Sequence, residues 1–579
     1  MTSTDGVSAP SWIVLGRAPG GIRAALLSAD AAEISREQIE ASALPSWIER
    51  HEAQAAPRWV WSDAPQWYAS LLASGVRVAR CHDLRLCHAI LRESAFVDAG
   101  AAVRGSTEWD AAPASAGDEK APTLFELDAA SVATGLPDGL DDALAEFARQ
   151  RDAIAGSSDP ARLRLLTAAE SAGALVAEEL RAAGVPWDAA AHDRILTETL
   201  GARPAGGGQP ARLAAAADRV RQALGDPAAS LDSQPKLLRA LHRSGVLVES
   251  TSRWELAEQK HPVIEPLLEY KKLARLQSAN GWSWLEGWVH DGRFRPVYVP
   301  GGVVTGRWAS SGGGALQLPR QLREAVRADP GWKLVIADVA QLEPRVLASM
   351  ASDTALATAA RGRDLYEGIV DSGAVATRQQ AKIALLGAMY GATTGESGRL
   401  VPRLRRAYPR AMGLVDDAAR TGEDGGVVTT WLGRTSPRPS EAWSAAQSRA
   451  TEAEASGADE MRARRWARDR GRFTRNFVVQ GTAAEWALSW LADLRGRLYA
   501  LPPVGDAQAA PRSGPVFARR PHLAFFLHDE VIVHAPESLA EDSARAVTDA
   551  AAAAGRLLFG DFPLEFRLDV RISDTALKD

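Results

Sequence analysis

Two stretches far apart in the chain, Lys333-Leu-Val-Ile-Ala-Asp338 and residues 523–535, decide the fold that we expect. The first is a continuous apolar run, typical of a buried strand, that ends in a carboxylate. The second contains two apolar strands, 523–527 and 531–535, joined by the tight corner His528-Asp529-Glu530. A carboxylate at the end of an apolar strand is unfavourable unless it is solvated, paired or bound to a metal. The two stretches therefore predict strands whose ends carry functional or turn-forming acids.

Asp338 and Asp529 are of the residue type that binds a hard divalent cation. Mg²⁺ takes oxygen ligands and is usually held by one or two carboxylates together with substrate phosphates. Two such ions about 3.5–4 Å apart can activate an attacking oxygen and stabilise a leaving one. Either acid alone could equally end a strand or serve a turn, so the metal hypothesis depends on the two being close together.

Residues 378–391 carry a second pattern, with Arg378, Lys382, Leu386 and Tyr390 spaced by four on one face of a helix that ends before a glycine. Cations near a helix N-terminus oppose the helix dipole, so they favour an anionic partner such as a triphosphate. Lysine is informative because 59 of the 67 basic residues are Arg. Lys382 can donate a proton to a leaving pyrophosphate, which Arg cannot do. The alternative is a solvated basic helix edge.

A third pattern places Arg472, Asn476 and Gln480 at the same spacing of four, at the end of a stretch with seven Arg among residues 462–475. Such a basic patch can follow a phosphate backbone. Together with Arg307, these side chains can reach the minor-groove acceptors that all base pairs share, which would test pair geometry without reading sequence. The alternative for residues 462–470 is a solvated charged face.

The composition bounds the classes of protein that remain. The 579 residues exceed a single compact domain. A net charge of −5 excludes a generally basic nucleic-acid coat, and the two cysteines, Cys81 and Cys87, exclude a disulfide scaffold or a cysteine-based zinc module. No run of about 18 apolar residues and no leader-like start are found. We therefore expect a cytoplasmic, multidomain protein, mixed α/β over residues 1–160 and mainly helical over 343–490, with a surface insertion at 502–519.

Taken in order, the motifs resemble those of family A DNA polymerases, the DNA polymerase I group. The matching motifs are Ser230-Leu-Asp-Ser233-Gln-Pro-Lys236, Thr305-Gly-Arg307-Trp-Ala-Ser-Ser311, Gln317-Leu-Pro319, Asp338-Val-Ala-Gln341-Leu-Glu343-Pro-Arg345, Arg378…Lys382…Tyr390-Gly391, Gly426-Val-Val-Thr-Thr-Trp-Leu-Gly-Arg434, Asn476…Gln480-Gly-Thr-Ala-Ala-Glu485 and His528-Asp529-Glu530. The resemblance covers residues 163–579 and implies a right-hand polymerase with an antiparallel palm sheet and helical thumb and fingers. Its domains would be an exonuclease-like domain at 1–160, thumb at 161–290, palm at 291–350 and 491–579, and fingers at 351–490.

The resemblance also implies a role for each matching residue in template-directed addition of dNTPs to a primer 3′-hydroxyl, in DNA replication or repair. Asp338 and Asp529, supported by Glu530, would hold two Mg²⁺ ions, for which Mn²⁺ can substitute. The residues implied to bind the incoming dNTP are Arg323, Gln341, Glu343, Arg378, Lys382, Leu386 and Tyr390, with Glu343 and Tyr390 as a gate against the ribose 2′-hydroxyl. The residues implied to hold the primer-template are Arg307, Gln317, Arg472, Asn476, Gln480 and His528. Asp338, Asp529 and Lys382 would be the catalytic residues.

This sequence departs from the family pattern at several positions. Leu386 stands where an aromatic residue is usual, so sugar and base discrimination is expected to differ. Val339-Ala340 replaces an aromatic-Ser pair, Pro344 removes a backbone donor after the gate Glu, and Tyr366 stands where a phosphate-binding His is common. None of these changes removes a metal ligand, so we expect polymerisation to survive.

The N-terminal residues resemble the family's RNase H-like 3′–5′ exonuclease domain in position and pattern, but without its acids. That chemistry requires several carboxylates around two metals. Residues 12–16 carry no acid, Cys87 stands at an expected Asp, and residues 168–176 lack the last motif's Tyr and Asp. We therefore expect proofreading to be lost. We also expect the protein to lack the 5′-nuclease domain that many members of the family have.

Two other functions remain as alternatives. A non-catalytic DNA-binding scaffold has no physical need of Asp338, Lys382 and Asp529 together, and a single-chain RNA polymerase is disfavoured by Glu343 beside Tyr390. We expect primer-template DNA and dNTPs as partners, a monomer associated with the nucleoid, no membrane contact, and a 5′ nuclease supplied by a separate protein.

Overall fold

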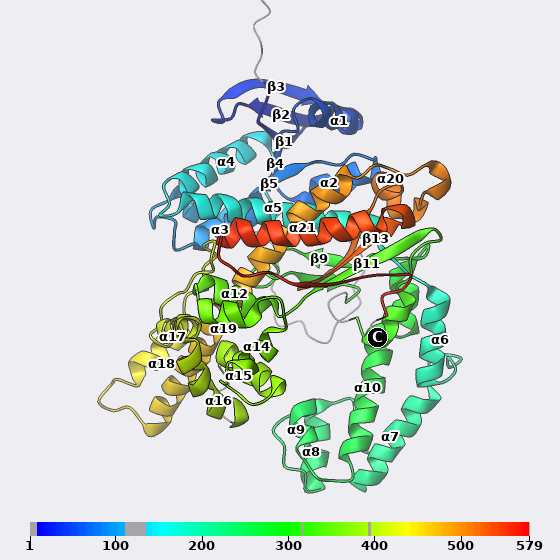
Figure 1. Ribbon diagram of the computed structural model, residues 1–579, viewed down its shortest axis with the longest axis vertical. Helices are drawn as coiled ribbons and strands as arrows, with labels where there is room; N and C mark the ends of the chain where they lie inside the picture. The colour runs from blue at the N-terminus through cyan, green and yellow to red at the C-terminus, as the bar shows by residue number, and fades with distance from the viewer. Residues whose placement is uncertain (1–8, 111–134, 315–317, 392–394, 578–579) are drawn as a thin grey trace, which may run out of the picture. The chain divides into compact units, whose positions relative to one another are not determined.

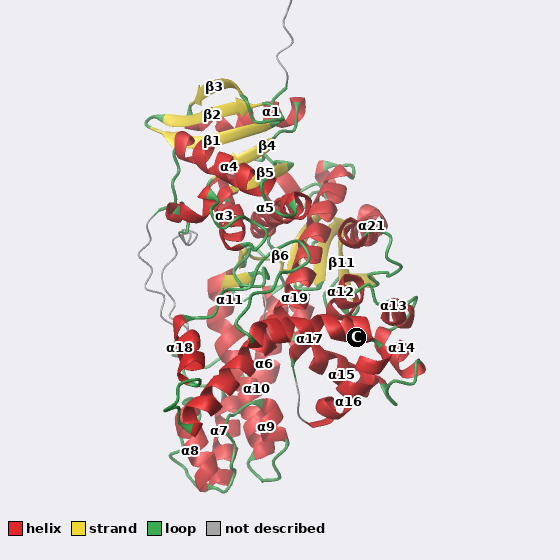
Figure 2. Cartoon of the chain, turned by 90° about the vertical axis from the view of Figure 1, so that its left-hand side faces the viewer, coloured by secondary structure: helices red, strands yellow, loops and turns green. Residues whose placement is uncertain are grey.

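The computed structural model describes residues 9–110, 135–314, 318–391 and 395–577, and the chain divides into two compact units (Figures 1 and 2). Unit 1 comprises Met1–Ala183, Tyr298–Ser310 and Gly331–Ile572, and unit 2 comprises Gly184–Val297, Ser311–Pro330 and Ser573–Asp579. Gln317 and residues 111–134 lie outside the described residues. Among the residues that are described, no helix combines the length and the apolar character needed to span a membrane.

The N-terminal part of unit 1 is built on a five-stranded mixed sheet of order β3-β2-β1-β4-β5. Its strands are β1 (Trp12–Ala18), β2 (Gly21–Leu27), β3 (Glu33–Ile39), β4 (Arg58–Trp61) and β5 (Arg80–Asp83). Its helices are α1 (Leu44–Gln54), α2 (Ala64–Ala73), α3 (Leu84–Glu93), α4 (Leu140–Ala155) and α5 (Pro160–Ala183). β2 runs antiparallel to β1, whereas β4 runs parallel to it. Because both faces are covered, β1 is apolar without alternation at Ile13, Val14 and Leu15.

A second sheet in unit 1 contains the two stretches that the sequence singled out. Its order is β12-β13-β11-β14, with strands β11 (Trp332–Val339), β12 (His522–Leu527), β13 (Glu530–Pro536) and β14 (Leu568–Ser573). β13 lies antiparallel between β11 and β12, and its register pairs Asp338 with Glu530. Helix α21 (Ala540–Phe559) lies along this sheet (Figure 1). The three predicted strands are confirmed, each within two residues of the expected ends.

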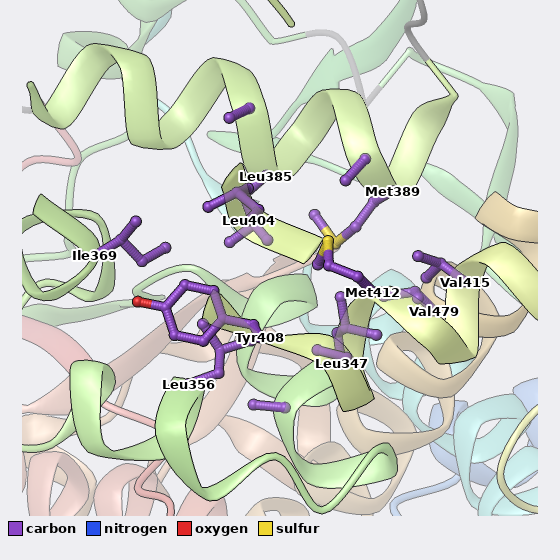
Figure 3. Close-up of a cluster of buried hydrophobic side chains, with 14 of the residues drawn as sticks. Leu347, Leu356, Ile369, Leu385, Met389, Leu404, Tyr408, Met412, Val415 and Val479 are labelled. Atoms are coloured by element: carbon purple, nitrogen blue, oxygen red, sulfur yellow. The ribbon is translucent and has the colours of Figure 1, made fainter. Parts of the chain in front are cut away.

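A helical region follows β11 in the chain. It contains α12 (Leu342–Met350), α13 (Thr354–Ala360), α14 (Leu365–Asp371), α15 (Arg378–Tyr390), α16 (Gly395–Ala407), α17 (Pro409–Glu423), α18 (Glu441–Arg449) and α19 (Gly457–Ala500). All of these helices except α18 share an apolar cluster, to which Leu385 and Met389 contribute from the buried face of α15 (Figure 3). The cluster fixes the orientation of α15, so the opposite face of that helix carries the spaced residues predicted from sequence.

The sequence suggested that segment 502–519 is a surface insertion, but part of the segment is buried. It forms short turns and the helix α20 (Gly514–Phe517), and Phe517 is only 5% exposed. Phe517 packs into the apolar cluster of the N-terminal sheet, with Val516 beside it. The Pro and Gly content of the segment correctly indicated a loop. The apolar pair Val516 and Phe517 packs this loop against the N-terminal sheet.

Unit 2 is mainly helical. Its elements are α6 (Ala189–Leu200), α7 (Ala211–Leu224), α8 (Gln234–Arg243), α9 (Arg253–Ala257), α10 (Ile264–Asn280) and α11 (Trp282–Trp288), with β6 (Val185–Pro186), β7 (Val289–His290) and β8 (Arg293–Phe294) in a small sheet. Leu237, Leu267 and Tyr270 belong to its core. Ser233 stands directly before α8 but makes no side-chain capping bond, and Pro262 precedes α10 by two residues.

Candidate active site

The carboxylates of Asp338 and Asp529 lie at one end of the β11–β13 pair, where the two strands bring them together. The backbone N–H of Val339 donates to the carbonyl oxygen of Asp529 at 2.9 Å, so the corner that carries Asp529 is fixed against the end of β11. Burial and, next, the negative charge of Asp338 raise the pKa of Asp529 to about 6. Two carboxylates that repel each other in this way form a site that favours a cation.

The donor set at this edge suits a hard divalent cation. Within the described parts of the chain, no three or more His, Cys, Asp or Glu side chains form a group that could hold a metal ion. The edge instead offers a pair of carboxylates, with Glu530, 3% exposed, next to Asp529 in the chain. Oxygen-only ligands in this number match a Mg²⁺ site that substrate phosphates complete. The residues present therefore fit the ions that the sequence predicted.

Two residues beside the carboxylates have left-handed backbone conformations, which non-glycine residues rarely adopt. Gln341 has φ 52° and His528 has φ 55°. Such conformations persist only where the surrounding structure enforces them, and they concentrate at functional sites. Burial, and next the Arg307 cation, lower the pKa of His528 to about 4, so its imidazole is neutral at neutral pH. A neutral ring can donate and accept hydrogen bonds beside the carboxylates.

Glu343 links two distant residues across a pocket of about 270 Å³. Its carboxylate accepts hydrogen bonds from the guanidinium of Arg307 and from the phenol of Tyr390. Burial and the Glu343 charge raise the pKa of Tyr390, which therefore stays a phenol and a donor. The pocket is also lined by Gln341, Tyr366, Leu386, His528 and Asp529. The structure thus brings the predicted gate, Leu386 and the predicted catalytic carboxylate of Asp529 to the same cavity.

Arg378 is held by a residue that the sequence analysis missed. Its guanidinium donates to Asp364 at 2.7 Å and lies over the ring of Tyr366, 5.5 Å from the ring centroid. The amide of Gln341 donates to the same carboxylate at 3.1 Å. Asp364 also caps α14 by accepting from the N–H of Glu367. An Asp directly before a helix is a capping signal that the sequence offered, but its second role toward Arg378 required the fold.

Pro344 lacks a backbone donor, as expected, but at a position where the helix does not use one. It lies in the first turn of α12, where backbone N–H groups have no partner within the helix. The neighbouring Arg345 is buried, and its guanidinium donates to the carbonyls of Ala340, Arg363 and Glu565. Arg345 therefore fixes the turn between β11 and α12, a role that its motif alone did not reveal.

The residues predicted to hold primer-template DNA lie mainly along α19. The hydroxyl of Thr305 donates to Gln480 at 3.0 Å, and the side-chain oxygen of Asn476 is buried with no hydrogen-bond partner among the described residues. Arg472 packs across the end of α15, where the left-handed Gly391 is needed because a Cβ there would lie 2.6 Å from the Arg472 side chain. Lys382 is exposed one turn after Arg378.

One predicted nucleotide-binding residue belongs to the other compact unit of the chain. Arg323 belongs to unit 2, where it is 5% exposed within the 3₁₀ turn Arg320–Ala325. Gln317 lies outside the described residues, as stated above.

The N-terminal domain contains a buried polar network where the sequence lacks the exonuclease acids. His82 bonds to Gln150 at 2.7 Å, Gln150 donates to Glu146 at 2.7 Å, and Glu146 bonds to His88 at 2.8 Å. All four side chains are at most 5% exposed. The thiol of Cys87 lies 3.8 Å from the other nitrogen of His82, and burial raises the pKa of that thiol. The polar groups at this place thus bind one another.

Comparison with known proteins agrees with this arrangement. The family model of DNA polymerase family A matches residues 239–574, more than half of the chain. The chain belongs to DNA polymerase family A. The resemblance inferred from the motifs is therefore confirmed, and the family match covers both carboxylates, α15 and the α19 residues.

Individual relatives in the family are similar over the same region. A thermostable DNA polymerase I of Thermus filiformis is 26% identical over 343 residues, which is 54% of this chain and 36% of that protein. A DNA polymerase I of Chloroflexus aurantiacus is 28% identical over 368 residues, 59% of this chain and 35% of that protein. The matched region thus spans little more than a third of the length of these curated relatives.

A solved family structure is similar over nearly the whole chain. The POL domain of Pol1 from M. smegmatis, in complex with DNA primer-template and dNTP, superposes with a TM-score of 0.64. The match covers 97% of this chain and 95% of that one at 16% sequence identity. The mixed α/β polymerase-domain fold expected from sequence is therefore confirmed.

Proposed function

We propose that this protein is a template-directed DNA polymerase that adds dNTPs to a primer 3′-hydroxyl, acting in gap filling or repair. The observation that carries the proposal is that Asp338 and Asp529, from distant strands, lie near enough for the charge of Asp338 to raise the pKa of Asp529, which lines a pocket. Family membership supports the same reaction. The proposed domains are the exonuclease-like domain, thumb, palm and fingers at the boundaries given above, in a protein that works as a monomer on primer-template DNA.

Within this proposal Asp338 and Asp529 hold two Mg²⁺ ions, with Glu530 in support. When bound, such ions supply activation of the attacking oxygen and neutralisation of the leaving charge. Phosphoryl transfer depends mostly on positioning and charge neutralisation, so the remaining residues orient the substrates. Arg378 and Lys382 bind the triphosphate, and the Lys382 ammonium donates a proton to the leaving pyrophosphate.

The sugar gate of the proposal consists of Glu343 and Tyr390, which share a hydrogen bond at the pocket. A buried carboxylate that already has partners excludes an additional hydroxyl by size and by desolvation. Leu386 lines the same pocket but cannot stack on a base. We therefore expect the pocket wall formed by Leu386 to discriminate less strictly between sugars and bases than an aromatic residue would. A ribonucleotide polymerase on the same fold is disfavoured by the gate.

Primer extension by the purified full-length chain tests the proposal. We expect Mg²⁺-dependent extension that Asp338→Asn and Asp529→Asn each lower by about 10³-fold or more, because each removes charge that the ions require. An Asp152→Asn variant, which removes an exposed carboxylate in the N-terminal domain, is the matched control. Extension by either palm variant at the wild-type rate would refute the metal assignment.

We further propose that the N-terminal domain is an exonuclease-like fold without nuclease activity that supports the polymerase. The buried network of His82, Gln150, Glu146 and His88 supports this, because its polar groups are already satisfied by one another. Incubation of the protein with 3′-labelled single-stranded DNA and Mg²⁺ is expected to leave the DNA intact. Digestion that persists in the Asp529→Asn variant would disprove the proposal, because that activity could not come from the palm.

A further inference from the structure

The turn at residues 429–435 overlaps a family motif to which the predicted site assigns no role. The hydroxyl of Thr430 accepts from the backbone N–H of Arg434 at 2.9 Å, which closes the turn. The N–H of Leu432 donates at 3.0 Å to the carboxylate of Glu485 on α19. The turn is therefore fixed against the helix that carries the predicted primer-template residues.

The side chain of Arg434 extends from this turn and contacts two elements from other parts of the chain. Its guanidinium donates to Glu170 of α5 at 2.6 Å, and Glu170 is only 1% exposed. The same guanidinium lies against Gly306, where an added Cβ would be 2.6 Å from the Arg434 Nε and 2.9 Å from its Cζ. Gly306 has φ 85°, a conformation that glycine adopts without strain. Arg434 is thus packed between a buried carboxylate and the backbone of Gly306.

Gly306 directly precedes Arg307, so the backbone that Arg434 contacts also carries the predicted partner of the sugar gate. Two backbone bonds close this turn, from the N–H of Gly306 to the carbonyl of Val303 at 2.7 Å and from the N–H of Val303 to the carbonyl of Arg307 at 3.1 Å. The guanidinium of Arg307 donates to Glu343. Because close-packed groups transmit displacements, a shift of Gly306 would move Arg307 relative to Glu343.

We propose that Glu170 and Arg434 are positioning residues that hold Arg307 in the orientation in which it binds primer-template DNA. This inference rests on the proposed function and assigns two further residues to the same site. Arg434 acts through the backbone of Gly306, and Glu170 acts by keeping the Arg434 guanidinium in place. A charge-assisted hydrogen bond is shorter and stronger than a neutral one, so the pair fixes the guanidinium more firmly than packing alone.

The test neutralises the whole pair and measures binding of primer-template DNA by the full chain without nucleotides. Glu170→Gln with Arg434→Gln leaves neither charge buried without its partner, and such replacements are often close to neutral for stability. A glutamine at position 434 is too short to pack against Gly306 as the guanidinium does. We expect the Kd to rise roughly 3- to 10-fold, because the DNA must then order the Arg307 side chain. A protein that was merely less stable would bind fewer DNA molecules per chain at the same Kd.

A mutant cycle with Arg307→Gln shows whether the pair acts through Arg307. Arg307→Gln alone should raise the Kd by about 10-fold or more, because it removes a charged hydrogen-bond donor. Adding the two pair substitutions to Arg307→Gln should raise the Kd by less than about twofold further. An equal rise in both backgrounds would overturn the proposal. So would an Arg307→Gln variant that binds DNA like the wild type, since the pair would then have nothing to position.

The control neutralises another buried pair of α5, in which the Nε of Arg495 donates to Glu179 at 3.1 Å. Glu179 lies about 13 Å beyond Glu170 along the helix. Glu179→Gln with Arg495→Gln should therefore leave the Kd unchanged, and a rise equal to that of the test variant would overturn the proposal. Because binding is measured without synthesis, wild-type protein that binds DNA but does not extend primers refutes the proposed function alone. Wild-type protein that does not bind primer-template DNA refutes both.

Discussion

Two buried or half-buried acidic regions of unit 1 behave in opposite ways. In the predicted palm, burial and the Asp338 charge raise the pKa of Asp529 to about 6. In the N-terminal domain, burial alone would raise the pKa of Glu146, but hydrogen bonds from His88, Gln150 and Arg149 lower it instead. In the first region, negative charge accumulates beside a pocket. In the second, hydrogen-bond donors of the same domain compensate the charge of Glu146. A buried acid therefore indicates a reactive site only where hydrogen-bond and ion-pair partners do not already compensate its charge.

The largest effect that would test this contrast concerns the stability of the N-terminal domain. Glu146→Gln leaves an acceptor too few for His88, Ser106, Arg149 and Gln150, which all bond to that carboxylate. Breaking a buried charged network from one side typically costs 3–5 kcal/mol, so we expect a loss of about 4 kcal/mol in unfolding free energy. Urea unfolding followed by tryptophan fluorescence measures it.

The Asp152→Asn control removes an exposed carboxylate from the same helix and should change stability by less than about 0.5 kcal/mol. At a temperature where Glu146→Gln is folded, its primer extension should equal that of the wild type. A variant that is stable but slow to extend would show that the network serves the reaction, and the contrast between the two regions would fail.

The strands and the carboxylate pair could be predicted because their signals are local. The apolar runs that end at Asp338 and at Asp529 allow few alternatives, and the spacing of four in α15 fixed its exposed face. What escaped prediction was pairing across loops, such as Asp364 with Arg378, 14 residues away. Composition alone also could not show which arginines of α19 bond to neighbouring elements and which face solvent. The backbone carbonyls to which Arg470 and Arg475 donate are known only once the helices pack.

A second buried acid of unit 1, on α5, provides a pH test of intermediate size. Burial raises the pKa of Glu178, which is 6% exposed, to about 7 from an ordinary value of 4.5. Between these values the folded chain keeps a proton that the unfolded chain has lost. The folded state therefore binds more protons there, and stability falls as pH rises from about 4.5 to 7.

Glu178→Gln should abolish this slope, since the neutral amide does not titrate. We expect the variant to exceed the wild type by about 2–3 kcal/mol at pH 8 and to match it near pH 4. Unfolding free energies across this range decide the matter. If the difference is the same at pH 4 and pH 8, packing rather than ionisation distinguishes the two side chains, and Glu178 is already satisfied like Glu146.

The smallest expected effect concerns Asp364, whose carboxylate pairs with Arg378 as the triphosphate would in the proposed function. Asp364→Asn removes the competing charge, while an Asn oxygen can still accept from Glu367 and cap α14. The ring of Tyr366 remains beneath the guanidinium and keeps it in place. We therefore expect the KM for dNTPs to fall two- to fivefold with kcat little changed, an effect of about 0.5–1 kcal/mol. Steady-state extension at saturating primer-template measures both constants.

The sign of the change separates competition from positioning. If Asp364 mainly holds Arg378 in a productive orientation, the same variant raises KM, because a freed guanidinium must be ordered by each nucleotide that binds. Asp371→Asn, which breaks the exposed pair with Arg363 in the same region, controls for a general change of charge and should leave KM unaltered. A fall in KM would show that Asp364, although it lies near the proposed site, is paired within the protein. It would also show that Arg378 leaves Asp364 when the nucleotide binds. The partners of Glu146, in contrast, stay bound to it.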